Sequence, residues 1–275
     1  MTVQRLNDRF SALKAEGRAA FVAYVMAGDP DAATAQRILD GLPAAGADII
    51  ELGFPFSDPM AEGPPIQRAA QRALAGGMTL NGTLQMVRSF RAADQATPIV
   101  LMGYMNPLLT AGLEAFARDA AEAGVDGLIV VDCPPEEADP LADALDAVGI
   151  ALIRLATPTS DDARLKVVVR RTQGFVYYVS VAGVTGVKEA DADTVAPHVA
   201  RVRAASGLPV AVGFGIRTPE RAAAVAKVAD GVVVGSALVD EIAGAIAQNR
   251  DPVPFVMEAA AALAKAVRTA RHGSA

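Results

Sequence analysis

The sequence predicts a closed (β/α)8 barrel, with an extra N-terminal helix and a long C-terminal helix. Short apolar segments recur at a steady interval, and stretches of ten or more residues rich in Ala, Leu, Arg and Glu separate most of them. Strands that alternate with helices favour a parallel sheet, and eight such units fit within about 250 residues. We expect a single domain over residues 1–275.

The expected elements follow in order along the chain. Residues 2–16 form an amphipathic helix, because Val3, Leu6, Phe10 and Leu13 recur at helical spacing. The expected strands are 21–27, 47–54, 98–104, 125–131, 150–156, 175–180, 209–214 and 231–235. The expected helices include 31–45, 113–123, 135–148, 161–171, 193–205, 219–228, 237–248 and a long final helix, 254–271.

Short glycine-containing junctions support this alternation. Gly46, Gly124 and Gly149 each lie just before an expected strand, where a helix C-cap would pass directly into the strand. The competing interpretation is an open doubly wound sheet, which calls for a glycine-rich turn after the first strand. The turn at residues 27–30 is too short for that fingerprint.

Composition excludes several classes of function. The net charge is −6 and the sequence has no basic stripe, which argues against binding to nucleic acid. The only cysteine is Cys133, so no intrachain disulfide forms and nothing indicates secretion. The N-terminus lacks the apolar region of a signal peptide, and no apolar run reaches the ~18 residues of a membrane span. We therefore expect a cytoplasmic protein.

The scarce residue types narrow the chemistry. The two histidines, His198 and His272, offer no metal-ligand spacing and no base for a Ser-His-Asp relay, so we expect no metal. None of the five lysines falls in an apolar strand, where a Schiff-base lysine would be expected. If the protein is an enzyme, carboxylates, tyrosines and the backbone must carry its reaction.

Glu51 is the most informative single residue, because it lies inside the apolar run 48–54. A glutamate removed from water tends toward a raised pKa and can give and take a proton near neutral pH. The structural alternative is a glutamate paired with an arginine, and Arg154 in the fifth expected strand is a possible partner. Asp58 and Glu62 follow in a proline-rich loop, which suggests that their positions are fixed.

Glycine-rich segments follow three neighbouring strands: 183–186 after the sixth, 213–215 after the seventh and 235–236 after the eighth. In (β/α)8 enzymes, loops in this region commonly bind phosphate through backbone N–H groups and a helix N-terminus. The alternative is that these glycines only make tight turns. Residues 181–189 are read as a flexible lid or, alternatively, as an ordinary loop.

The remaining candidates are aromatic or acidic. Two or three of the four tyrosines, all in expected strands, would face the cavity, and at least one would only fill the barrel. Asp132 ends the fourth expected strand, where it could be catalytic, bind a ligand or cap a helix.

Residues 51–67, ELGFPFSDPMAEGPPIQ, resemble the signature segment of the tryptophan synthase alpha subunit. Segments 28–30, 182–186, 212–216 and 234–236 resemble that family too, and the similarity spans essentially the whole chain. The resemblance implies a reversible lyase that cleaves indole-3-glycerol phosphate to indole and glyceraldehyde 3-phosphate in a retro-aldol-type reaction. It implies no cofactor.

The resemblance also implies roles for particular residues. Glu51 matches the acid/base that serves C3 of the indole and the side-chain hydroxyl, and Glu62 matches a second carboxylate, usually aspartate, that pairs with the indole N–H. Val181 replaces an arginine that is frequent at the lid, and Tyr24 stands where phenylalanine is frequent. The positions matching the substrate site are Tyr24, Met102, Tyr104, Asp132, Tyr177 and Thr185, and those matching the phosphate site are Gly186, Phe214, Gly215, Gly235 and Ser236.

The family implies a partner as well, a pyridoxal-phosphate beta subunit in an α2β2 heterotetramer. Asp58, Pro59 and the turn Asn106-Pro107 match the region that faces this partner, and nothing in this chain binds pyridoxal phosphate. Two other functions stay open at this point. One is a phosphate-ligand-binding barrel that mainly activates the beta subunit, and the other is a phosphate-sugar isomerase or aldolase.

Overall fold

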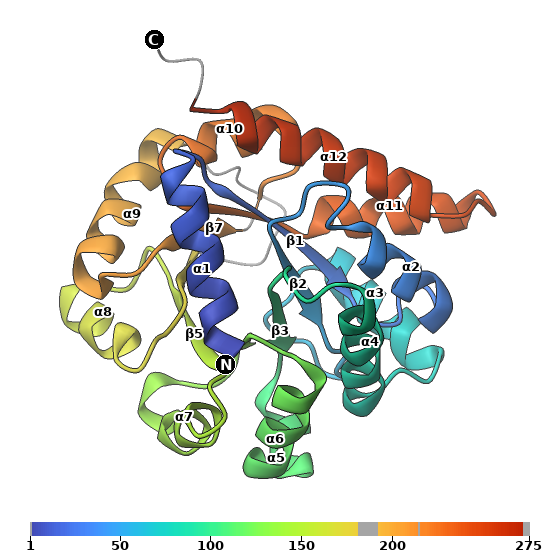
Figure 1. Ribbon diagram of the computed structural model, residues 1–275, viewed down its shortest axis with the longest axis horizontal. Helices are drawn as coiled ribbons and strands as arrows, with labels where there is room; N and C mark the ends of the chain where they lie inside the picture. Colours follow the sequence, from blue (N-terminus) through green and yellow to red (C-terminus); the bar gives the residue numbers. More distant parts are fainter. Residues whose placement is uncertain (1, 181–191, 214, 272–275) are drawn as a thin grey trace.

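The computed structural model, which describes residues 2–180, 192–213 and 215–271, is an eight-stranded parallel barrel (Figure 1). The strands pair in sequence order, and β1 pairs with both β2 and β8, which closes the sheet. The (β/α)8 prediction is therefore confirmed, and the open-sheet alternative is wrong. The strands are β1 (Ala20–Met26), β2 (Ile49–Gly53), β3 (Ile99–Gly103), β4 (Gly127–Val130), β5 (Ala151–Ala156), β6 (Val176–Val179), β7 (Val210–Gly213) and β8 (Gly231–Val234).

Helices surround the strands (Figure 1). The helices that the sequence predicted are α1 (Thr2–Ala15), α2 (Ala32–Gly41), α6 (Leu113–Ala123), α7 (Asp139–Asp146) after the 3-10 turn η1 (Pro135–Glu137), α8 (Asp162–Val169), α9 (Ala192–Ser206), α10 (Pro219–Ala226), α11 (Ser236–Ala247) and α12 (Val253–Thr269). The predicted elements did not include α3 (Pro64–Ala75), α4 (Leu80–Ala93) and α5 (Met105–Ala111). None of the described helices is long and apolar enough to cross a membrane.

Two helices have prolines in their first turn that the sequence predicts to lie in loops. Pro64 and Pro65 occupy the first turn of α3, and Pro107 lies in the first turn of α5. Proline is compatible with a first helical turn, because N–H groups there have no partner within the helix. The predicted Asn106-Pro107 turn is therefore wrong, and both residues are helical.

Helix α1 closes the amino-terminal end of the barrel (Figure 1). The Leu6 side chain is fully buried and packs next to Gly127 at the start of β4. Arg5 and Arg91 both pair with the fully buried carboxylate of Asp126, which also accepts a hydrogen bond from the Ile99 N–H at 2.8 Å. These contacts tie α1 and α4 to the strand ends β3 and β4.

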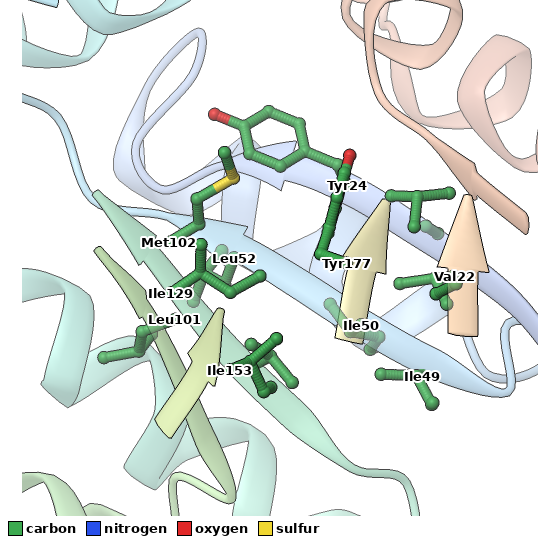
Figure 2. Packing of buried hydrophobic residues seen from close by; sticks show 14 of the residues in the cluster. Val22, Tyr24, Ile49, Ile50, Leu52, Leu101, Met102, Ile129, Ile153 and Tyr177 are labelled. Carbon is green, nitrogen blue, oxygen red and sulfur yellow. The ribbon is translucent and has the colours of Figure 1, made fainter. Parts of the chain in front are cut away.

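The strand register decides which side chains share a layer of the barrel interior. Tyr24 of β1 pairs in register with Glu51 of β2, and Glu51 pairs with Val100 of β3. Neighbouring parallel strands project paired residues to the same side, so Tyr24 and Glu51 point into one layer. Figure 2 shows Tyr24, Met102 and Tyr177 together at one end of the packed interior.

Replacing Asp126 should destabilise the fold. The Arg91 side chain is only 7% exposed, so in Asp126→Asn its guanidinium loses a charged partner while it stays buried. We expect the free energy of unfolding, measured by urea denaturation, to fall by about 3 kcal/mol. Asp119→Asn on the exposed face of α6 is the matched control and should change it by less than about 0.5 kcal/mol. Equal stability of both variants would contradict this account of the barrel base.

Candidate active site

A cavity of about 130 Å³ opens at the carboxyl ends of the strands, where a (β/α)8 barrel places its chemistry. Residues from most of the strand ends and from the loop after β2 converge on it. The lining residues are Tyr24, Glu51, Glu62, Gly63, Pro65, Ile66, Met102, Tyr177, Gly215, Ile216, Arg217, Val233, Gly235 and Ser236. The structure thus brings both predicted catalytic glutamates into one cavity.

Glu51 lies in the middle of β2 and is 1% exposed. Its Oε2 atom has no hydrogen-bond partner among the described residues. Burial raises the pKa of Glu51 to about 8, and the nearby charge of Glu62 contributes to the increase. The side chain is therefore largely protonated at neutral pH, which equips it to donate a proton.

The structural alternative for Glu51, a pair with Arg154, is wrong. The Arg154 guanidinium is buried beside the thiol of Cys133, and the charges that act on it include those of Glu136 and Arg164. No ion pair joins it to Glu51 within the described ranges, and its Nη2 atom has no hydrogen-bond partner there. Burial lowers the pKa of Arg154 for the same reason that it raises that of Glu51.

Glu62 approaches the cavity from the loop between β2 and α3. Its side chain is buried, and burial raises its pKa to about 7. The residue before it, Ala61, donates its N–H to the hydroxyl of Tyr104 at 3.0 Å. That hydrogen bond ties the loop to the end of β3. The two acids thus differ in how they are held. Glu51 belongs to a strand, whereas Glu62 belongs to a loop that a side chain from another element anchors.

Glycines at the strand ends make room for the aromatic wall of the cavity. A Cβ atom at Gly53 would overlap the Tyr24 hydroxyl, and one at Gly213 would overlap the hydroxyl of Tyr177. Nearer the base of the Tyr24 side chain, a Cβ at Gly235 would lie only 3.1 Å from Cδ1. Burial raises the pKa of both tyrosines well above the usual value, so their hydroxyls stay protonated.

The structure describes part of the glycine-rich side of the cavity, where the sequence predicts a phosphate site. Gly215, Gly235 and Ser236 line it, and Ser236 is the first residue of the 12-residue helix α11, whose N–H groups open toward this end. Gly215 has φ of 75°, a conformation that a side chain would strain. Thr185, Gly186 and Phe214, and the predicted lid 181–189 with Val181, lie outside the described residues.

Other predicted residues lie around the cavity and do not line it. Tyr104 is the N-cap of α5, and its ring contacts Phe56 with centroids 5.2 Å apart. Asp132 is exposed and accepts a hydrogen bond from the Met105 N–H at 2.8 Å, so it fixes the start of α5. Tyr178 faces the helices and stacks on His198.

Sequence reasoning did not assign six of the lining residues to the site: Gly63, Pro65, Ile66, Ile216, Val233 and Arg217. Gly63 and Pro65 belong to the segment 51–67, and Ile66, Ile216 and Val233 resemble any other core residue in the sequence. Arg217 could have been found, because it comes two residues after Gly215 in a glycine turn already singled out. In the structure Arg217 pairs with Asp240 of α11.

Two buried carboxyl groups of raised pKa lie where the strands of the barrel end. This arrangement defines a class of protein, the (β/α)8 enzymes that work by acid–base chemistry.

Comparison with known proteins identifies the family within this class. The family model described as "Tryptophan synthase alpha chain" matches residues 10–268. The chain is 76% identical to the tryptophan synthase alpha chain of Phenylobacterium zucineum over 99% of this chain and 98% of that one. It is 72% identical to that of Caulobacter vibrioides, with full coverage of both.

Solved structures agree with these relatives. The tryptophan synthase subunit alpha of Legionella pneumophila superposes with a TM-score of 0.90 at 42% identity, covering 96% of this chain and 98% of that chain. A chain from Mycobacterium tuberculosis tryptophan synthase gives a TM-score of 0.86 at 40% identity, with the same coverage. This chain belongs to the tryptophan synthase alpha chain family.

The buried acid should cost stability at neutral pH. Because the folded-state pKa of Glu51 is raised from 4.5 to about 8, wild type loses stability as the pH rises between these values. Glu51→Gln removes this loss. We expect its free energy of unfolding to exceed that of wild type by about 3 kcal/mol at pH 7 and to match it below pH 4.5.

Urea unfolding at several pH values measures this difference. Glu122→Gln, at an exposed position on α6, is the control and should follow wild type throughout. A Glu51→Gln variant that is less stable than wild type at pH 7 would show that Glu51 is a satisfied structural residue.

Proposed function

We propose that this chain cleaves indole-3-glycerol phosphate to indole and glyceraldehyde 3-phosphate as the alpha subunit of tryptophan synthase, acting as a carbon–carbon lyase in tryptophan biosynthesis. The observation that carries the proposal is the pair Glu51 and Glu62, both buried in one cavity and both with raised pKa. A retro-aldol cleavage needs one group that moves protons and one that stabilises a positive ring. The two acids supply these needs.

Glu51 moves the protons. In its carboxylic acid form it donates a proton to C3 of the indole ring, which leaves the ring nitrogen positively charged. The resulting carboxylate then takes the proton of the side-chain hydroxyl. The carbon–carbon bond breaks, its electron pair returns to the ring, the aldehyde forms and Glu51 recovers its proton.

Glu62 stabilises the ring nitrogen. As a carboxylate it accepts a hydrogen bond from the indole N–H, and this interaction strengthens as positive charge develops. With pKa values of about 7 for Glu62 and about 8 for Glu51, the required state has Glu62 ionised and Glu51 protonated. Activity is therefore greatest between these values, falling at lower pH as Glu62 protonates and at higher pH as Glu51 ionises.

The rest of the cavity holds the substrate. Tyr24, Met102 and Tyr177 offer a buried, largely apolar wall to the indole ring. Gly215, Gly235 and Ser236 offer backbone N–H groups and a helix N-terminus to the phosphate. We assign Tyr104 and Asp132 to the surroundings of the substrate, Thr185 to the substrate itself, and Gly186 and Phe214 to the phosphate.

The partner-facing surface runs over the loop after β2 and helix α5. It includes Asp58, Pro59, Asn106 and Pro107, and it also presents two of the large apolar side chains that the described structure leaves exposed, Met60 at 83% and Leu109 at 58%. Exposed apolar side chains of this kind suit a protein interface. We propose that the beta subunit covers this surface in an α2β2 heterotetramer in the cytoplasm, with residues 1–275 as one domain.

A binding barrel that only activates the beta subunit is not favoured. Binding alone gives no use for two buried carboxyl groups of raised pKa, whose burial lowers stability at neutral pH. An isomerase or aldolase is disfavoured by the family assignment.

Glu51→Gln should abolish cleavage, because it keeps the shape of the side chain but cannot shuttle a proton. We expect indole release from indole-3-glycerol phosphate, measured with the beta subunit present, to fall by at least about 10²-fold. Binding of glycerol 3-phosphate, a probe of the phosphate end, should stay within about threefold of wild type. Near-wild-type turnover by the variant would contradict the assignment of Glu51.

A further inference from the structure

The side-chain amide of Gln67 holds the main chain of the residue that carries the second acid. Its Nε2 donates a hydrogen bond to the Glu62 carbonyl oxygen at 2.9 Å, and the Pro59 carbonyl oxygen lies at 3.4 Å from the same atom. Gln67 does not line the cavity. We propose that Gln67 is a positioning residue that fixes the Glu62 carboxylate in the cavity; the proposal rests on the function proposed above.

The loop around Glu62 has few donors of its own. Pro59 has no N–H, and Pro64 and Pro65 remove the first two N–H groups of α3 that could bind a loop acceptor at the helix start. The loop's own backbone bonds join Met60 N–H to the Asp58 carbonyl at 2.8 Å and Glu62 N–H to the Pro59 carbonyl at 3.2 Å. Both bonds lie within the loop and do not tie it to the barrel.

Two side chains make that connection, and they act on consecutive residues. Tyr104 accepts from the N–H of Ala61, and Gln67 donates to the carbonyl of Glu62. Tyr104 extends from the end of β3 and Gln67 from α3, so the main chain is held from two sides. These two hydrogen bonds fix the Cα position of Glu62, and this position determines where its side chain can reach.

Helix α3 provides a rigid base for Gln67. Arg72, five residues further along α3, makes two hydrogen bonds to the buried carboxylate of Asp29, at 2.7 and 2.8 Å. Ile66 and Ala70 on the same helix are buried against the barrel. These contacts fix α3 on the barrel, so the helix does not move with the loop. The amide of Gln67 is the connection that holds the loop in place relative to α3.

Loss of the amide should affect both the position and the ionisation of Glu62. A loop released from α3 lets water reach the carboxyl group, and burial is what raises its pKa. Solvation therefore lowers this pKa toward the ordinary value and moves the low-pH limb of the activity profile to lower pH. A displacement of about 1 Å can reduce turnover by about 10²-fold without a matching change in binding.

The test compares Gln67→Met with Gln71→Met. Methionine has similar length and no donor, and Gln71 is an exposed glutamine on the same helix. With the beta subunit present, we expect Gln67→Met to lower kcat for indole release by about ten- to hundredfold while KM stays within about threefold. The low-pH limb of kcat/KM should move down by about one pH unit. Gln71→Met should match wild type in all three.

A second measurement does not depend on turnover. Carbon-13 NMR of the isolated full chain, labelled at glutamate carboxyl carbons, reports the Glu62 pKa directly, and Gln67→Met should lower it from about 7. The proposal is overturned if Gln67→Met keeps both the wild-type kcat and the wild-type Glu62 pKa, or if Gln71→Met loses as much activity. Absence of indole release from wild type would instead contradict the proposed function, and the NMR titration would still decide the role of Gln67.

Discussion

Burial of the Glu51 carboxyl group without a cationic partner is the constraint on which the rest of the site depends. The buried aspartates of the described residues each have an arginine: Asp126 pairs with Arg91, and Asp29 with Arg72. Asp48 likewise accepts two hydrogen bonds from Arg18, at 2.8 and 2.9 Å. These pairs join helices and loops to the barrel. Glu51 has no such partner among the described residues, so it keeps a proton near neutral pH, and that proton is what the chemistry needs.

Rigid structure around the two acids holds them in the cavity. Strand register sets Glu51 beside Tyr24, and glycines at the strand ends leave space for the tyrosine rings that exclude water. Glu62 comes from a loop, so it needs Tyr104 and Gln67 to hold its main chain. The second acid thus has the more adjustable environment, which fits its assigned role as a hydrogen-bond acceptor and leaves proton transfer to the rigid strand residue.

Particular residues explain how much of this could be predicted from the sequence. Strand periodicity and glycine junctions predicted a parallel sheet with crossover helices, and the eight units together with the short turn at residues 27–30 favoured the closed barrel over an open sheet. Glu51 was found because a carboxylate contrasts with an apolar strand, whereas Ile66 and Val233 have no such contrast with other core residues. Helices α3 and α5 were missed because Pro64, Pro65 and Pro107 resemble loop residues when their place in a first helical turn is unknown. The absence of a pair between Glu51 and Arg154 required coordinates, because the direction of the Arg154 side chain depends on packing between β5 and the surrounding helices.

The central claim is that Glu51 is an unpaired buried acid that holds its proton at neutral pH, and its titration tests this most directly. Carbon-13 NMR of the carboxyl carbon in the folded wild-type chain, assigned by comparison with Glu51→Gln, measures that pKa. The account predicts a value of about 8. A pKa near the ordinary 4.5 would mean that Glu51 is ionised and satisfied in the folded state, and it could not then donate the proton that starts the cleavage.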